Sequence, residues 1–386
     1  MKQCIEGSNA IARTIKLCRP AVISAYPITP QTHIVEDLAK FKADGEADFE
    51  FVRSESEFSA ASIVLGASAT GVRTYTATSS QGLLLMTEVI FTIAGMRLPV
   101  VLTCANRAVS APINIWNDQQ DVMVVRDSGW IQLFAKDNQE AVDFHIIAYK
   151  IAEQLKIPVM VNVDGFILTH TVEPVDIPTI EDVKKFLPDY MPTPGQYLDV
   201  DNPISLGSFA TPDTYMEIRK DLAVDLAAAK KTISGELGKF AKTFGRGDGN
   251  LVEYYGAKDA DVVFVALGSV VGTVMDAVDE LNEKNNILFP THSAGVVSIK
   301  CFRPFPEEEL LKKLKNAKYI AVLDKNISLG KEGVLATELK SIAHNNLNGK
   351  IQSFIIGLGG RDVTKEMIKD IYKKVQKRKN ATEFIG

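Results

Sequence analysis

The sequence predicts an α/β protein that consists of two open parallel-sheet domains. Short apolar segments, typical of buried strands, alternate along the chain with segments whose apolar residues recur every three or four positions, as in amphipathic helices. This alternation stops at the proline-rich residues 172–212 and the glycine-rich residues 245–250, and then begins again. Alternating strands and helices favour parallel sheets that are covered by helices on both faces.

The first domain is expected over residues 1–244 and opens with a helix whose apolar residues share one face. Arg19-Pro20 ends this helix, because proline lacks the backbone N–H that a helix interior needs. Small residues fill the segment 56–70, so that a helix there can pack closely against a sheet. We expect strands at 21–25, 48–53, 72–78, 98–105 and 159–164, helices from residue 34 and at 83–94 and 213–244, and an irregular excursion at 172–212.

The second domain is expected over residues 253–386, after a linker at 245–252. The linker opens with a short polar run that is rich in glycine, a composition typical of connections between domains. The remainder has the length of an ordinary domain. Strands are expected at 261–267, 296–300, 319–323 and 351–356, and helices at 270–284, 306–315, 332–344 and 364–377.

The composition excludes several classes of protein. The 386 residues are 46% hydrophobic and 24% charged, which is typical of globular domains, and the net charge of −5 lacks the basic footprint of a nucleic-acid binder. No apolar run approaches the ~20 residues that span a bilayer, and the first residues lack the pattern of a secretory signal. We therefore expect a cytoplasmic protein that binds neither nucleic acid nor a membrane.

The cysteines and histidines argue against a metal centre built from this chain alone. The cysteines are widely spaced and form no CxxC pair, so we expect neither an iron–sulfur cluster nor a disulfide. The histidines show neither HxxxH nor HExxH spacing. The residues concerned are Cys4, Cys18, Cys104 and Cys301, and His33, His145, His170, His292 and His344.

The turn from Tyr26 to Pro30 is the first candidate for a ligand site. It follows an expected strand, and open parallel sheets bind ligands beyond the carboxyl ends of their strands. Its two prolines restrict the backbone, so Thr29 is held in one orientation, from which its hydroxyl could donate to a carbonyl or carboxylate. A rigid strand-to-helix turn without a ligand explains the same residues.

Glu57 is the second candidate, because it lies between an expected strand and a helix of small residues. A partly buried carboxylate has a raised pKa and can share a proton with a basic ring nitrogen. Ordinary helix capping by Ser or Glu is the alternative.

Arg107 is the third candidate, at the carboxyl end of a central strand, where it could grip a carboxylate with two hydrogen bonds. A structural ion pair is the alternative. The polar loop at 113–121 that follows is either a docking surface or the wall of a pocket.

Two glycine-containing segments match part of a known cofactor-binding motif. Gly247-Asp248-Gly249 resembles the start of a metal–diphosphate motif, but it follows a polar helix and has no Asn about 25 residues later to complete a magnesium site. The segment 268–272 lacks the glycine spacing of a dinucleotide fold and is expected to be a tight turn. Neither segment is therefore assigned a ligand.

Several longer motifs, taken in order, resemble the α subunit of the pyruvate:ferredoxin oxidoreductase family. The resemblance covers nearly the whole chain, and its second half is similar to the family's domain II. The motifs are Tyr26–Thr32, Glu55–Ala60, Thr76–Leu83, Asn106–Ala108, Ala111–Asp118, Arg126–Trp130, Phe302–Pro306, Leu323–Ser328 and Gly357–Asp362.

This resemblance implies the role of each candidate residue. The first domain would bind the pyrimidine ring of thiamine diphosphate, and the second would resemble the C-terminal domain of transketolase. Glu57 would hydrogen-bond the aminopyrimidine ring and promote the tautomer that removes the thiazolium C2 proton. Arg107 would bind the substrate carboxylate and Thr29 the substrate. Cofactor-binding residues would be Pro27, Ile28, Glu57, Ser80 and Arg107, while Phe58 stands where the family usually has histidine and is given no polar role.

The resemblance also implies partners. In the family, a β subunit carries the Mg²⁺–diphosphate half of the site and a [4Fe–4S] cluster, and further clusters lie on a ferredoxin-like subunit. The chain would thus act with β, γ and δ subunits, as a dimer of heteromers, in an anaerobic organism. The reaction implied is pyruvate + CoA + oxidised ferredoxin to acetyl-CoA + CO₂ + reduced ferredoxin.

Other functions remain open at this point. The turn Thr78–Gly82 resembles pyruvate-type members and not 2-oxoglutarate-type members, but enzymes for branched acids such as 2-oxoisovalerate look very similar. Oxalate-oxidising relatives depart from the intact Tyr26–Pro30 segment. A scaffold subunit that keeps the fold without the chemistry is a second alternative. A NAD-dependent dehydrogenase is a third, although the sequence has no dinucleotide fingerprint.

Overall fold

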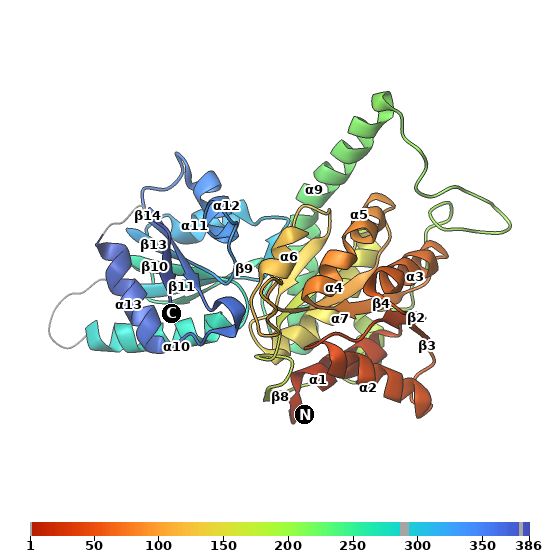
Figure 1. Ribbon diagram of the computed structural model, residues 1–386, viewed down its shortest axis with the longest axis horizontal. Helices are drawn as coiled ribbons and strands as arrows, with labels where there is room; N and C mark the ends of the chain where they lie inside the picture. The colour runs from red at the N-terminus through yellow and green to blue at the C-terminus, as the bar shows by residue number, and fades with distance from the viewer. Residues whose placement is uncertain (1, 286–292, 378–380) are drawn as a thin grey trace.

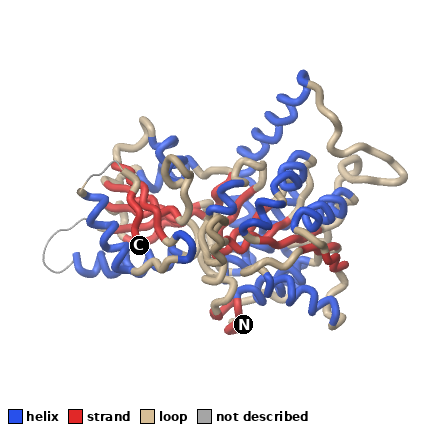
Figure 2. The backbone as a smooth tube through the Cα atoms, viewed as in Figure 1, coloured by secondary structure: helices blue, strands red, loops and turns tan. Residues whose placement is uncertain are grey.

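The computed structural model describes residues 2–285, 293–377 and 381–386, and within them the chain forms two sheets flanked by helices (Figures 1 and 2). His292 lies outside the described residues. A seven-stranded sheet occupies the N-terminal part and a six-stranded sheet the C-terminal part. The predicted α/β class with two open parallel sheets is thus confirmed.

The first sheet has the strand order β12-β6-β7-β5-β4-β2-β3, and only β12 runs antiparallel to its neighbour. Its strands are β2 (Val22–Ala25), β3 (Glu50–Arg53), β4 (Thr74–Thr78), β5 (Val101–Asn106), β6 (Ile131–Phe134), β7 (Val159–Asp164) and β12 (Cys301–Arg303). One face carries α1 (Gly7–Cys18), α2 (Thr32–Ala43) and α7 (Asn138–Leu155), and the other carries α3 (Glu57–Ala69), α4 (Ser80–Leu85) and α5 (Thr87–Gly95).

Burial on both faces explains why the strands read as apolar runs. In β5, Val101 and Ala105 pack under α1, α2 and α7, whereas Leu102 and Cys104 pack under α3 and α5, because successive side chains of a strand point to opposite faces. Between them, the buried Thr103 hydroxyl lies 2.6 Å from the hydroxyl of Tyr75. The strand therefore has no solvent-facing row that would show as alternation in the sequence.

The second sheet has the order β15-β14-β13-β10-β11-β9, with β9 antiparallel to β11 and the other pairs parallel. Its strands are β9 (Val252–Gly256), β10 (Val262–Ala266), β11 (Ala294–Ile299), β13 (Tyr319–Asp324), β14 (Lys350–Ile356) and β15 (Glu383–Ile385). Helices α10 (Val270–Asn285) and α13 (Lys365–Gln376) cover one face, and α11 (Glu307–Leu314) and α12 (Val334–Ala343) cover the other.

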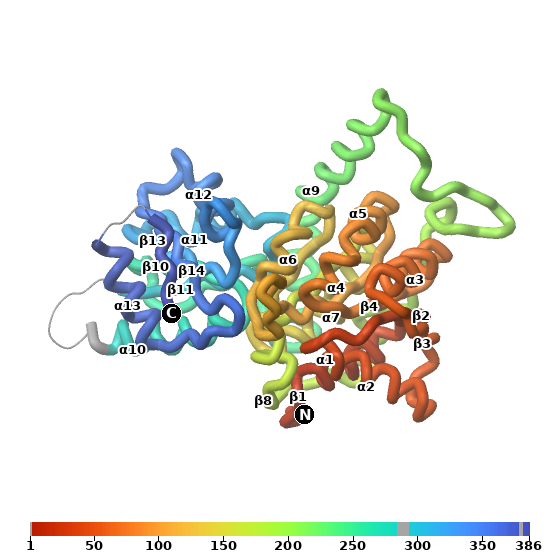
Figure 3. The backbone as a smooth tube through the Cα atoms, in the orientation of Figure 1, coloured from red at the N-terminus to blue at the C-terminus, as the bar shows by residue number. Residues whose placement is uncertain are grey.

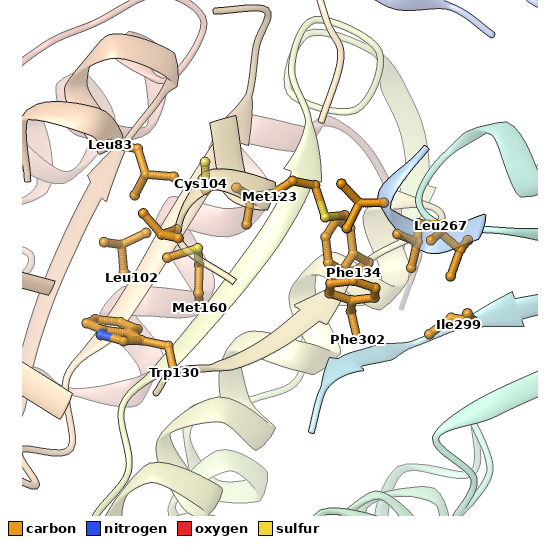
Figure 4. Packing of buried hydrophobic residues seen from close by; sticks show 14 of the residues in the cluster. Leu83, Leu102, Cys104, Met123, Trp130, Phe134, Met160, Leu267, Ile299 and Phe302 are labelled. Carbon is orange, nitrogen blue, oxygen red and sulfur yellow. The ribbon is translucent and has the colours of Figure 1, made fainter. Parts of the chain in front are cut away.

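One hydrophobic cluster extends from the first sheet into the second. Figure 4 shows Phe134 of β6 next to Phe302 of β12, with Leu267 and Ile299 nearby. The two phenyl rings meet edge to face, and their centroids are 6.1 Å apart. The pairing of β12 with β6 carries residues of the C-terminal part back to the edge of the first sheet. The boundary at 245–252 stays a prediction.

Several elements differ from the expectations. The region 83–94 holds two helices, α4 and α5, and the excursion at 172–212 contains β8 (Val172–Val175) and α8 (Ile180–Phe186). Strand β8 pairs antiparallel with β1 (Gln3–Glu6). Strand β6 and helix α7 were not predicted from the sequence. The buried residues of α7 surround the helix, so it has no single apolar stripe with a polar face opposite.

Helix α9 (Pro212–Phe244) confirms the long helix that was expected to close the first part of the chain. Figures 1 and 3 show its N-terminal half projecting away from the sheet together with the loop at 187–211. This arm, residues 187–224, exposes the apolar side chains of Met191, Val200, Phe209, Tyr215 and Met216. No helix among the described residues is both long and apolar enough to cross a bilayer.

An ion pair is buried where the two halves meet. Lys325, just after β13, lies with its Nζ 3.2 Å from Oδ2 of Asp164 at the end of β7, and the two side chains are 4% and 1% exposed. Asp164 also accepts a hydrogen bond from the Ser269 hydroxyl at 2.5 Å. Burial alone would raise the pKa of Asp164, but Lys325 and the hydrogen bonds hold it below its usual value.

Removing one partner of this pair is expected to weaken the contact between the halves. Asp164→Ala leaves the Lys325 ammonium buried without its counter-charge, which costs about 3–5 kcal/mol. We expect a lower melting temperature and faster proteolysis at 245–252. The double variant Asp164→Ala with Lys325→Met should be more stable than Asp164→Ala alone, because no unpaired charge remains. Melting of Asp164→Ala at the wild-type temperature would contradict this prediction.

Candidate active site

The carboxyl ends of β3, β2, β4, β5 and β7 lie side by side along one edge of the first sheet. After β2 the chain adds β3 on one side, and it then returns to add β4 on the other side. Such a reversal of strand order leaves a crevice in which open sheets bind ligands. Thr29, Glu57, Ser80 and Arg107 all follow these strands, so the fold brings the predicted residues to one edge.

Arg107 and Thr29 are in direct contact. The Arg107 Nη1 donates to the Thr29 carbonyl oxygen at 2.9 Å, and its Nε donates to the carbonyl of Asn114 at 3.0 Å. Burial lowers the pKa of Arg107 below its usual value, and Asp121 opposes that effect. Within the described residues, Nη2 makes no hydrogen bond, while the Thr29 side chain is exposed. The pair therefore has free donors with which to hold a small anion.

The backbone under these residues is held by Asp121, which the sequence analysis left without a role. Its Oδ2 accepts from the backbone N–H of both Ser80 and Arg107, each at 3.0 Å, and its Oδ1 accepts from the Asn106 amide at 3.2 Å. Burial raises the pKa of Asp121 to about 7, against the effect of these donors. The only sequence signal was an acidic residue directly before the apolar run 122–125.

Ser80 lies in a backbone conformation that its bonds must stabilise. Its φ of +45° is unusual for a residue with a side chain, and its hydroxyl is 2.5 Å from the Ala108 carbonyl. The hydroxyl is therefore turned into the protein, and its expected place in the cofactor site stays a prediction.

Glu57 is the first residue of α3 and is only 7% exposed. Ser56 caps this helix by accepting from the Ser59 N–H at 3.2 Å, so capping does not occupy Glu57. A Cβ on Gly82 would lie 2.7 Å from the Glu57 Oε1, so the absence of a side chain there makes room for the carboxylate.

The Glu57 carboxylate makes no hydrogen bond or ion pair with any residue that the structure describes. The Thr78 hydroxyl also lies next to Gly82, and it is fully buried without a partner in the described part of the chain, as are several other hydroxyls. Glu57 keeps an exposed fraction of 7%, and its carboxylate oxygens are not among the fully buried atoms that lack a partner, so the carboxylate is open to a hydrogen bond from a group outside this chain. A carboxylate in this position could share a proton with a basic ring nitrogen, as expected from the sequence, and this role of Glu57 stays a prediction.

The turn that contains Pro27 and Ile28 is anchored by a residue the sequence analysis did not single out. The buried Gln31 donates its amide to the Ala77 carbonyl of β4 at 2.7 Å, and its Oε1 accepts from the Ile28 N–H at 3.2 Å. Gln31 thereby holds the turn at a defined position relative to the end of β4. Whether Pro27 and Ile28 touch a cofactor stays a prediction.

The polar loop at 113–121 contacts the second half of the chain and also lines a cavity. Asn114 donates to the Gly359 carbonyl at 3.0 Å, and the Gly360 N–H donates to the Asn117 carbonyl at 2.6 Å, so the loop is fixed to the second half. A cavity of about 610 Å³ lies beside this contact. Its lining includes Trp116, Phe166, Lys325 and Arg361.

Two family descriptions match the chain. The family described as "Pyruvate flavodoxin/ferredoxin oxidoreductase, thiamine diP-bdg" matches residues 13–236, and "Pyruvate:ferredoxin oxidoreductase core domain II" matches residues 260–368. Together they cover every strand of the first sheet and strands β10, β11, β13 and β14 of the second.

Individual proteins resemble the chain over almost its full length. The pyruvate synthase subunit PorA of Methanocaldococcus jannaschii is 51% identical, over 99% of this chain and 97% of the relative. The ketoisovalerate oxidoreductase subunit VorA of Pyrococcus horikoshii is 43% identical, over 98% and 94%. A solved structure of the 2-oxoglutarate:ferredoxin oxidoreductase from Magnetococcus marinus superposes with a TM-score of 0.72 at 20% identity. It covers 97% of this chain, which spans 65% of that longer chain, and supports the fold alone.

Proposed function

The chain belongs to the pyruvate:ferredoxin oxidoreductase family, and we propose that it is the α subunit of a pyruvate-oxidising enzyme. This enzyme would convert pyruvate and CoA to acetyl-CoA and CO₂ and pass the electrons to ferredoxin. The observation that carries the proposal is the buried Glu57 at the edge of the sheet, whose carboxylate has no hydrogen-bond partner among the described residues. The 51% identity to a pyruvate synthase subunit, over 99% of the chain, supports it. An oxidoreductase subunit of this type acts within a complex of several subunits.

Glu57 would hold a proton between its Oε1 and the pyrimidine ring of the cofactor. Thiamine diphosphate, when bound, supplies a nucleophilic carbon and an electron sink for decarboxylation. The space over Gly82 allows the carboxylate to face a ring, and the first turn of α3 stabilises its negative charge when the proton leaves. A group that exchanges a proton at this ring matches the general acid–base role of a carboxylate.

Arg107 and Thr29 would position the 2-oxoacid. The Nη2 of Arg107, which bonds no residue in the described part of the chain, supplies a charged donor for the carboxylate, and the exposed Thr29 can donate its hydroxyl to the oxo group. Asp121 and Gln31 hold the backbone of these residues, so that neither needs to be ordered when substrate arrives. We expect Asp121 and Gln31 to act only as positioning residues.

The site would be completed by a partner subunit. The sequence offers no acceptable metal–diphosphate motif and no grouped cysteines, so Mg²⁺ and the [4Fe–4S] clusters would lie on β and ferredoxin-like subunits. The exposed apolar residues of the arm, Phe209, Tyr215 and Met216 among them, support burial against another chain. The β, γ and δ subunits, a dimer of heteromers and a cytoplasmic location remain predictions.

A branched 2-oxoacid is the second candidate substrate. The chain is 43% identical to a ketoisovalerate oxidoreductase subunit, which supports a branched acid. It is 51% identical to a pyruvate synthase subunit, so the support for pyruvate is stronger. The two acids differ only in the side chain, so Arg107 and Thr29 would have the same roles with either. The difference would be in the pocket walls.

An activity assay on the native complex tests the function. The tagged chain is captured anaerobically with its partners, and CoA-dependent viologen reduction is followed with pyruvate, 2-oxoisovalerate, 2-oxoglutarate and oxalate. We expect the highest kcat/KM with pyruvate. Preference for 2-oxoisovalerate would replace the substrate and keep the mechanism. No reduction with any 2-oxoacid, although clusters and thiamine diphosphate are present, would favour a scaffold subunit.

A further inference from the structure

Three side chains that bind metals elsewhere meet at the N-terminal edge of the molecule. Glu6 ends β1, His33 lies in the first turn of α2, and His170 follows β7. Their ligand atoms all lie within 4.8 Å of one another. The His33 Nδ1 is 2.7 Å from the Glu6 Oε1, and the rings of His33 and His170 are 4.5 Å apart.

This donor set suits a zinc-type ion. Two imidazoles and one carboxylate are a known set of three protein ligands for Zn²⁺, with a fourth position open to water. With metal–ligand bonds of about 2.0–2.1 Å, tetrahedral ligand atoms are roughly 3.4 Å apart. The ligand atoms, which lie within 4.8 Å of one another, must therefore move closer together to close on an ion. The His170 Nδ1 is 2.7 Å from the Thr169 hydroxyl, which leaves its Nε2 for the metal, and the 47% exposed side chain of His33 leaves an entry path.

The surroundings favour a cation. A hollow of about 480 Å³ beside the trio is lined by Cys4, Ile5, Glu6, Asn9, His33, Glu36 and Asp37. No lysine or arginine contributes to this lining among the described residues, while Glu36 and Asp37 add negative charge. The field at the site therefore attracts a divalent ion and opposes an anion.

We propose that Glu6, His33 and His170 form a divalent transition-metal site, separate from the proposed thiamine site and not dependent on it. A bound ion would tie β1, α2 and the loop after β7 together, and α2 follows directly on the turn that carries Thr29. The spacing of histidines in the sequence argued against such a site. The three ligands come from segments 27 and 137 residues apart, since 33 − 6 = 27 and 170 − 33 = 137, and only the fold brings them together.

Metal titration of the full-length chain, purified without a histidine tag, tests the site. We expect one Co²⁺ per chain with the visible absorption of a four- or five-coordinate ion, displacement of Co²⁺ by Zn²⁺, and a rise in melting temperature with Zn²⁺ that EDTA reverses. His33→Ala and His170→Ala should lose the absorption and the stabilisation. His344→Ala, which removes an exposed histidine elsewhere, should keep both.

Glu6→Gln provides a second test if a histidine variant fails to fold, because it keeps the shape of the side chain and removes only its charge. We expect weaker Co²⁺ binding with unchanged secondary structure by circular dichroism. Stoichiometric binding that survives in both histidine variants, or no binding by the unaltered chain, would overturn the proposal and leave the trio as a hydrogen-bonded cluster.

Discussion

Glu57→Ala is expected to lower the turnover of the assembled enzyme by about 10²–10⁴-fold, the usual contribution of a general acid–base group. The buried carboxylate has no partner within the described part of the chain, so its removal should change neither the folding of this subunit nor its assembly. Glu57→Gln should be nearly as inactive, because the amide keeps the size of the side chain but cannot exchange the proton. The measurement is viologen reduction by the captured complex with saturating pyruvate.

Glu55→Gln is the matched control for Glu57. Glu55 lies two residues earlier in the same motif, but it is exposed and its carboxylate bonds the Ser59 hydroxyl. We expect normal turnover from this variant. Near-normal turnover of Glu57→Ala, with the subunits still co-purifying, would show that the cofactor assignment is wrong and would revive the scaffold subunit.

Arg107→Ala should mainly weaken recognition of the 2-oxoacid carboxylate. Loss of a partly buried charged donor costs about 2–4 kcal/mol, which lowers kcat/KM by roughly 30- to 1,000-fold. We expect much of the effect in KM, with CoA affinity unchanged. Arg107→Lys should recover only part of it, because a point charge cannot replace the planar fork that also holds the Thr29 and Asn114 carbonyls.

Arg13→Ala serves as the control for the loss of a guanidinium group. Arg13 is exposed on α1, and its hydrogen bond is to the Gln3 side chain at 3.2 Å. Kinetic constants equal to those of the unaltered enzyme are expected. If Arg107→Ala left KM for pyruvate unchanged while lowering the melting temperature, Arg107 would be a structural residue only.

Much of the fold could be predicted from local patterns. Strands such as β5 and β7 are buried on both faces and show as apolar runs, and α9 shows its amphipathic period over 33 residues. Helix α7 escaped detection because the sheet, α1 and α9 surround it and remove the polar face that marks a helix. Strand β12 has only three residues, too few to show a pattern in the sequence, and it is recognised as a strand by its pairing with β6.

The residues of the candidate site also fall into two groups, those that the sequence predicts and those that it does not. Thr29, Glu57 and Arg107 stand at the ends of strands, in motifs that the sequence displays directly. Asp121, Gln31 and Gly82 were missed because their functions depend on contacts 14 to 46 residues distant in the chain, such as Asp121 with Arg107 and Gln31 with Ala77. No periodicity or spacing marks such contacts.

The α/β class, the succession of most strands and helices along the chain, and the family can all be predicted from the sequence, because each depends on local periodicity or on contiguous motifs. Which distant residues meet is visible only in the folded chain: Lys325 with Asp164, the polar loop with Gly359, and Glu6 with His33 and His170. The physical reason is that parallel sheets are assembled from crossover connections. Residues far apart in the chain become neighbours at one sheet edge, and the free energy that fixes their contacts comes from packing that no local segment contains.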